Sequence, residues 1–93
     1  MEFFLNHNYR LLKYLYENKL EVSGDIIVLV TQEIIAKNLH FGKGKVNRII
    51  NDLQSLGYLD NNYQVKGSYK LTNKTMMFFQ TMKKVGMELN DQI

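Results

Sequence analysis

Two asparagines and an arginine lie close together within one predicted helix. Asn47, Arg48 and Asn51 suit base recognition, because an amide pairs with the N6 and N7 positions of adenine and a guanidinium with guanine O6 and N7. At about 100° per residue they share one face with Gly44 and Ser55. The opposite stripe is apolar and contains Val46, Ile49, Ile50, Leu53 and Leu56. The pattern predicts a helix that buries one side and presents hydrogen-bonding groups on the other.

A short basic corner precedes this helix. It consists of Gly42, Lys43, Gly44 and Lys45. It would place two lysines and open backbone amides at a helix N-terminus, which suits a phosphate of a DNA backbone. A nucleotide-binding phosphate loop is excluded, because it needs a glycine five residues before the Gly-Lys pair and a serine or threonine directly after it.

The positive charge of the chain is concentrated in the region that contains the corner. The net charge is only +3, but the segment from Lys37 to Lys74 contains seven basic residues and only two acidic ones. The rest of the chain holds five basic and seven acidic residues. This asymmetry is typical of a phosphate-facing surface, although a scattered solvated face gives the same count.

Other segments of the chain predict the elements that position the corner and its helix. Asn6 or Asn8 can cap a first helix that ends near Asn18, and the β-branched run 26–30 predicts a buried strand. Thr31 then caps a second helix, so residues 31–57 form a helix-turn-helix, the unit that places its second helix in a major groove.

A β-hairpin, or wing, is expected over residues 58–72. Turn signals at Asn61-Asn62 and Lys66-Gly67 bound an alternating segment that ends at Thr72. Lys66 and Lys70 are candidate phosphate contacts, although many surface loops have this composition without a partner. The residues expected to contact DNA are Thr31, Gly42, Lys43, Gly44, Lys45, Asn47, Arg48, Asn51, Lys66 and Lys70.

A last helix is predicted over residues 73–90, with a broad apolar side. Part of it must pack against the first helix, but four of the five methionines lie here, and the surplus suggests a homodimer interface. The residues expected in that interface are Met76, Phe79, Met82 and Met87.

Several function classes are excluded or disfavoured. The chain has no cysteine, and nothing pairs His7 with His40 in sequence, so no metal site and no cofactor are expected. The sequence contains no recognisable set of nucleophile, base and acid, so it does not indicate an enzyme. The longest apolar run is far shorter than the roughly 20 residues of a membrane span, and the start of the chain is unlike a secretion signal, so a cytoplasmic protein is expected.

From Thr31 to Thr72 the chain resembles the winged helix-turn-helix family of bacterial, phage and plasmid DNA-binding regulators. The resemblance covers about half of the chain. The residues that carry it include the Ile35-Ala36 pair, Leu39, Val46, Arg48, Ile49, Leu53, the Gly57-Tyr58-Leu59 run and the segment 67–72. It implies a mainly α fold with a small sheet (α+β), in the order helix, strand, helix, helix, hairpin, helix, within one domain, 1–93. The family usually has glycine where His40 stands, and a Ser or Thr cap where this chain has Gly42.

The expected function is therefore that of a homodimeric, sequence-specific double-stranded-DNA-binding protein, a transcriptional regulator acting as a repressor. One alternative is a centromere-binding adaptor of a plasmid or phage partition system. Another is a winged-helix protein-interaction module that does not bind DNA, because a fold does not dictate its use.

Overall fold

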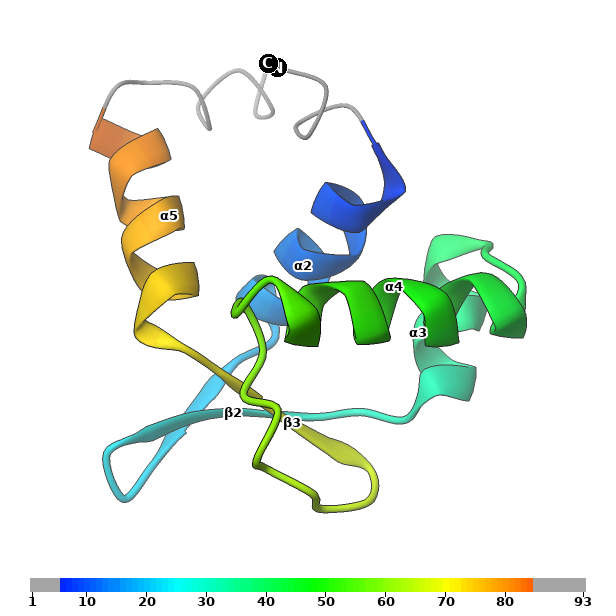
Figure 1. Ribbon diagram of the computed structural model, residues 1–93, viewed down its shortest axis with the longest axis horizontal. Helices are drawn as coiled ribbons and strands as arrows, with labels where there is room; N and C mark the ends of the chain where they lie inside the picture. Colours follow the sequence, from blue (N-terminus) through cyan, green and yellow to red (C-terminus); the bar gives the residue numbers. More distant parts are fainter. Residues whose placement is uncertain (1–5, 85–93) are drawn as a thin grey trace.

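The computed structural model describes residues 6–84 as a small sheet with helices packed against it (Figure 1). The elements are α2 (His7–Glu17), β1 (Leu20–Val22), β2 (Asp25–Leu29), α3 (Gln32–Leu39), α4 (Lys43–Ser55), β3 (Ser68–Leu71) and α5 (Asn73–Lys84). The sheet is antiparallel, with the order β1-β2-β3. The predicted α+β winged-helix architecture is confirmed.

The helix starts follow from capping residues in the sequence. The side chain of Asn6 accepts a hydrogen bond from the Tyr9 N–H (3.0 Å), and that of Thr31 accepts one from the Ile34 N–H (3.2 Å). Each cap satisfies an N–H group that has no partner within the first helical turn. The predicted starts of α2 and α3 are therefore confirmed.

One strand was not predicted. The sequence indicated a single strand at 26–30, but β1 pairs with β2 in a tight hairpin, with Leu20 opposite Ile27 and Val22 opposite Asp25. All three β1 residues are exposed, so the strand has no buried face whose apolar alternation would reveal it. The expected order of elements is corrected to helix, strand, strand, helix, helix, wing, helix.

The wing is less regular than the predicted hairpin. Only β3 is a true strand, and the first arm contributes a single isolated bridge, Leu59 to Leu71. Beyond that bridge the carboxylate of Asp60 accepts the Asn62 N–H (2.8 Å), which turns the chain away from the ladder. The hairpin prediction is corrected for this arm.

The core lies between the sheet and the helices. It is formed by Tyr9, Leu11, Leu12, Leu15, Val28, Val30, Ile35, Ala36, Phe41, Val46, Ile49, Ile50, Leu53, Leu59, Leu71, Phe79 and Met82. In Figure 1, α4 crosses in front of α2, with α3 beside its N-terminal end and α5 rising beyond its C-terminal end.

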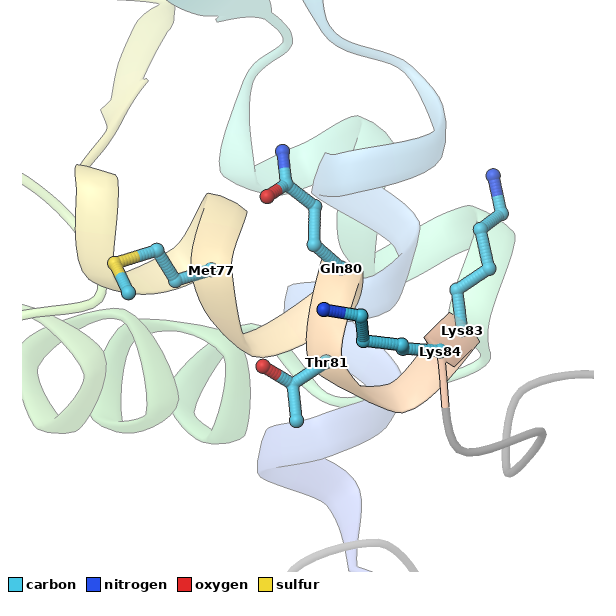
Figure 2. A pocket seen from close by; sticks show the side chains of 5 residues that line it. All are labelled: Met77, Gln80, Thr81, Lys83 and Lys84. Carbon is cyan, nitrogen blue, oxygen red and sulfur yellow. The ribbon is translucent and has the colours of Figure 1, made fainter.

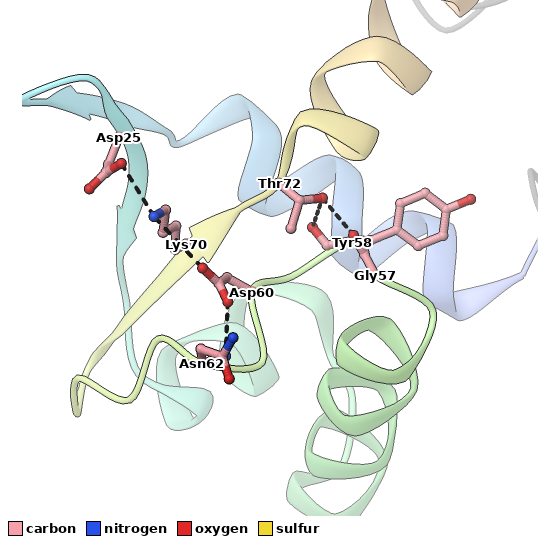
Figure 3. Close-up of polar contacts among 7 residues, drawn as sticks. All are labelled: Asp25, Gly57, Tyr58, Asp60, Asn62, Lys70 and Thr72. Carbon is pink, nitrogen blue, oxygen red and sulfur yellow. Dashed lines mark hydrogen bonds and ion pairs between the residues drawn. The ribbon is translucent and has the colours of Figure 1, made fainter.

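Hydroxyl groups join the end of α4 to the start of α5. Thr72 Oγ1 donates to the Gly57 carbonyl (2.6 Å), and Thr75 Oγ1 donates to the Tyr58 carbonyl (2.5 Å); Figure 3 shows the Thr72 contacts. The structure describes α5 to Lys84, so residues 85–90 of the predicted helix lie outside the described residues.

Candidate nucleic-acid interface

The two faces of α4 are those that the sequence predicts. Gly44, Asn47, Arg48, Asn51 and Ser55 are exposed, and Val46, Ile49, Ile50 and Leu53 are buried. Leu56 is the exception: it lies just after the last turn of α4 and is 49% exposed, so its place in the apolar stripe is corrected. The helix offers one continuous polar face to solvent.

An amide row connects α3 and α4 across that face. Asn51 Nδ2 donates to Asn47 Oδ1 (3.2 Å), and Asn47 Nδ2 donates to Gln32 Oε1 (3.5 Å) at the start of α3. Gln32 lies near Tyr69 of β3, where burial raises the pKa of Tyr69 and Gln32, as a hydrogen-bonding neighbour, opposes that rise. The row contains side chains that can bond base edges.

A groove runs along this row. One part, between α4 and the wing, is lined by Gln32, Ile50, Asn51, Gln54, Tyr63, Gln64, Val65, Lys66, Ser68 and Tyr69. A second part, between α3 and the wing, adds Thr31, Glu33, Lys43 and Gly67. Gln32 and Tyr69 lie in both parts, and the sequence analysis missed them because only the fold places the start of α3 beside β3.

Arg48 has a partner that the helical spacing could have revealed. Its guanidinium lies 3.5 Å from the carboxylate of Asp52, one turn along α4, and both side chains are about half exposed. An exposed pair of this kind contributes at most about 1 kcal/mol. The guanidinium can therefore exchange Asp52 for another acceptor at little cost.

The glycines of the corner are not required by the backbone. Gly42 is the N-cap of α4 and Gly44 lies in its first turn; neither has a positive φ, and a Cβ built on either would meet nothing within 4 Å. Their lack of side chains leaves the N-terminus of α4 open to close approach. Beside them, Lys43 pairs with Glu33 of α3 (3.4 Å), and both side chains are well exposed.

Lys45 does not point outward with the rest of the corner. It is only partly exposed, and its Nζ lies 2.9 Å from His7 Nδ1, at the start of α2. Lys43 and Lys45 are therefore directed to opposite flanks of α4. The expectation of a single basic corner is corrected to two separate cationic positions.

The two wing lysines also differ. Lys66 is exposed at the tip and lines both parts of the groove. Lys70 instead contacts Asp25 (3.3 Å) and Asp60 (3.7 Å), as Figure 3 shows, and the hydrogen bond and charge of Asp25, then Asp60, raise its pKa. Lys70 joins the wing to β2 and is not among the residues that line the groove, whereas the sequence predicts it as a phosphate contact.

Thr31 lies where α3 meets the wing. Its hydroxyl is used as the α3 cap, and the neighbouring Val30 N–H donates to the Gly67 carbonyl (3.1 Å). Thr31 remains exposed and lines the groove beside Lys66.

The residues expected in a dimer interface separate into different environments. Phe79 is 1% exposed and Met82 is 5% exposed within one chain, where Phe79 stacks on Tyr16 of α2 with ring centres 4.2 Å apart. Met76 is half-buried, and Met87 lies outside the described residues. The expected exposed interface is therefore corrected at Phe79 and Met82, which belong to the core of a single chain.

The outer face of α5 is mostly polar. Figure 2 shows the hollow lined by Met77, Gln80, Thr81, Lys83 and Lys84. Met77 is the apolar member, and 65% of it is exposed. Among residues 6–84, no cluster of three His, Cys, Asp or Glu side chains could hold a metal ion, and no helix is long and apolar enough to cross a membrane.

Comparisons with known proteins support the fold. No protein-family model matches the chain, and no curated protein sequence matches it. Its structure is similar to the crystal structure of a transcriptional regulator of the CRP/FNR family from Thermus thermophilus, with a TM-score of 0.63 and 19% sequence identity. The match covers 77% of this chain but 39% of the regulator, so this chain corresponds to a part of that protein. What the chain shares with that regulator is its fold.

Proposed function

We propose that this chain is a sequence-specific double-stranded-DNA-binding protein that acts as a transcriptional repressor. The polar face of α4 enters the major groove, where Asn47, Arg48 and Asn51 contact base edges. The observation that carries the proposal is the amide row, because it joins α4 to the start of α3 and two of its members, Gln32 and Asn51, line the groove beside the wing. The similar CRP/FNR structure is that of a transcriptional regulator, which supports this use of the fold.

The open corner supports the same proposal. Glycines that no backbone constraint requires leave room for a phosphate close to the N-terminus of α4. Lys43 and Lys66 lie on the adjoining groove, where each can contact a phosphate of the same strand. Base contacts specify the sequence, and these phosphate contacts position the helix.

A homodimer completes the proposal. A two-fold dimer would place two α4 helices about one DNA turn apart, roughly 34 Å, and so favour an inverted repeat. Among the described residues of α5, the exposed apolar side chain of Met77 supports a role for this helix in the dimer.

The test is selection of bound sequences from a random pool of duplexes, followed by affinity measurements on the selected site. Arg48→Ala and Asn51→Ala should each weaken specific binding by about 1 to 3 kcal/mol and relax preference at one base pair. Val22→Ala on the exposed strand β1 is the control and should bind as the parent does.

The outcome distinguishes the alternatives. A single inverted repeat supports a dimeric repressor, whereas tandem direct repeats would indicate a partition adaptor that coats its site. A failure to enrich any sequence, with no salt-dependent affinity for DNA, would contradict the proposal and favour a protein-interaction module. That alternative is supported by the acidic residues that already pair with Lys43 and Lys70.

A further inference from the structure

Three cationic or titratable side chains gather around one ring where α2 meets α4. The ring of Phe41 lies 4.8 Å from that of His7, 4.9 Å from the Arg10 guanidinium and 5.1 Å from Lys45 Nζ. Lys45 also bonds His7 directly, and Arg10 reaches the Leu39 carbonyl (3.5 Å). Packing on Phe41 thus holds the three side chains together, although the positive charges of Arg10 and Lys45 repel each other.

No acidic side chain relieves this repulsion within the described part of the chain. Lys43, Arg48 and Lys70 each pair with a carboxylate, but among residues 6–84 no ion pair involves Arg10 or Lys45. The described first turns of α2 and α4 also contain no acid. Within residues 6–84 the cluster is therefore a positive patch without a paired acid.

The hydrogen bond between Lys45 and His7 defines the state of the imidazole. An ammonium can only donate, so Nδ1 of His7 accepts and the ring is neutral. The ring is exposed, yet its approach to Phe41 removes water from one side. Desolvation, followed by the charges of Lys45, Arg10 and Arg48, lowers the pKa of His7 below its ordinary value of 6.5.

The position of the cluster relative to α4 identifies its partner. Lys43 and Lys45 are two residues apart, or about 200° around the helix, so they lie on opposite flanks. The Lys43 flank carries the α3 and wing groove, and the Lys45 flank carries α2. A helix in a major groove has a phosphate strand on each side, about 12 Å apart, and side chains on its two flanks can contact one strand each.

We propose that His7, Arg10 and Lys45 bind a phosphate of the DNA strand that borders α4 on the side away from the wing. This inference rests on the proposed DNA-binding function. When the phosphate binds, His7 takes up one proton from solvent at Nδ1, and the N–H that forms donates to the phosphate. Lys45 then loses His7 as an acceptor and donates to the phosphate instead.

The first test uses the selected duplex and the salt dependence of its affinity. Arg10→Gln and Lys45→Gln should each reduce the slope of log affinity against log salt by about 1, without changing sequence preference. Lys19→Gln, beyond the opposite end of α2, removes the same charge elsewhere and should leave the slope unchanged. Single phosphates replaced by neutral methylphosphonates should weaken the parent at one position on the far strand, but not weaken the Arg10 variant further there.

The second test is the pH dependence of affinity. A phosphate favours the imidazolium form, so affinity should rise as the pH falls toward the lowered pKa of His7 in the free protein, by up to about tenfold per pH unit for one proton, and should level off below that pKa. His7→Gln should flatten this profile at the same salt. Imidazole NMR signals should show a higher His7 pKa in the complex than in the free protein.

The outcomes separate this inference from the function on which it rests. A parent that binds the selected duplex, with slopes and pH profiles equal among the parent, the His7, Arg10 and Lys45 variants and the Lys19 control, overturns the phosphate site and leaves the proposed function standing. A parent with no affinity for DNA overturns both.

Discussion

His40 ends α3 in a conformation that ordinary residues avoid. Its φ of 60° and ψ of 41° lie in the left-handed region, where glycine is free of the clash that a Cβ causes. The winged-helix family that the sequence resembles usually has glycine at this corner, and the backbone explains why. A histidine is accepted here at the expense of some stability.

We therefore expect His40→Gly to stabilise the fold. Relief of the left-handed strain, less the extra freedom of glycine in the unfolded chain, should raise the free energy of unfolding by up to about 1 kcal/mol in urea titrations. His40→Ala keeps the strained backbone with a Cβ and is the control that should gain nothing. Equal stabilities for the glycine and alanine variants would contradict the strain argument.

The sequence predicts the partner of a charged residue only when the two residues are close together in the chain. Arg48 and Asp52 are four residues apart on one helix, so their pairing follows from the spacing of the sequence. Lys45 and His7 are 38 residues apart, and Lys70 is held between Asp25 and Asp60. These contacts depend on how α2 and the sheet are placed, and a count of basic residues does not reveal which of them face outward.

At the scale of elements, the start of α4 combines poor helix-forming residues with an open surface. Gly44→Ala should stabilise the fold by up to about 1 kcal/mol, because the added Cβ meets open space and alanine favours the helix. If DNA approaches this turn, the same methyl group should weaken affinity for the selected duplex by about threefold to tenfold, or about 0.7 to 1.4 kcal/mol.

The two effects of Gly44→Ala have opposite signs, which makes the measurement informative. Urea unfolding and DNA titration of the same preparation give both values, and Ser55→Ala at the other end of the polar face should change either little. A stabilised variant that binds DNA as tightly as the parent would show that the backbone of this turn stays away from DNA.

The wing allows a matched comparison of two lysines on one short segment. Lys66→Gln should reduce the salt slope of DNA binding by about 1, because Lys66 is exposed on the groove. Lys70→Gln should leave the slope unchanged, because its ammonium already lies between two carboxylates. Equal losses of slope in both variants would contradict the structural distinction between them.

The elements differ, for physical reasons, in how clearly their residues predict them. The stripe that contains Ile49 and Leu53 faces the core, so the helical spacing of its apolar residues predicts which side of α4 is buried. Leu20 and Val22 of β1 lie on an exposed edge strand, where no burial pattern is imposed. The first arm of the wing turns at Asp60 through a side-chain contact that competes with strand pairing.

For the whole molecule, the role of α5 decides how many chains act together. Its aromatic residues are used inside one chain: Phe79 packs on Tyr16 of α2 and also contacts Tyr9, with ring centres 6.1 Å apart. Thr75 anchors the start of the helix to the end of α4. The apolar surplus that suggested a dimer is therefore smaller than the sequence indicates, and its described remainder is centred on Met77.

Because Phe79 is buried and Met77 is exposed, a charge at each position should have a different effect. Phe79→Glu would bury an unpaired charge in the core and should cost several kcal/mol, so circular dichroism should show an unfolded or strongly destabilised chain. Met77→Glu places its charge on the surface and should leave the fold intact. If α5 forms the dimer interface, sedimentation at micromolar concentration should show a dimeric parent and a monomeric, folded Met77→Glu variant.

Met77→Leu keeps an apolar side chain of similar volume and should remain dimeric, which separates loss of apolar contact from any effect of substitution. The change to a monomer should also alter DNA binding, because two linked α4 helices engage both halves of an inverted repeat, whereas a monomer binds one half-site at a time. A parent that sediments as a monomer, and binds one half-site per chain without cooperativity, would remove the dimer and leave α5 as a core helix alone.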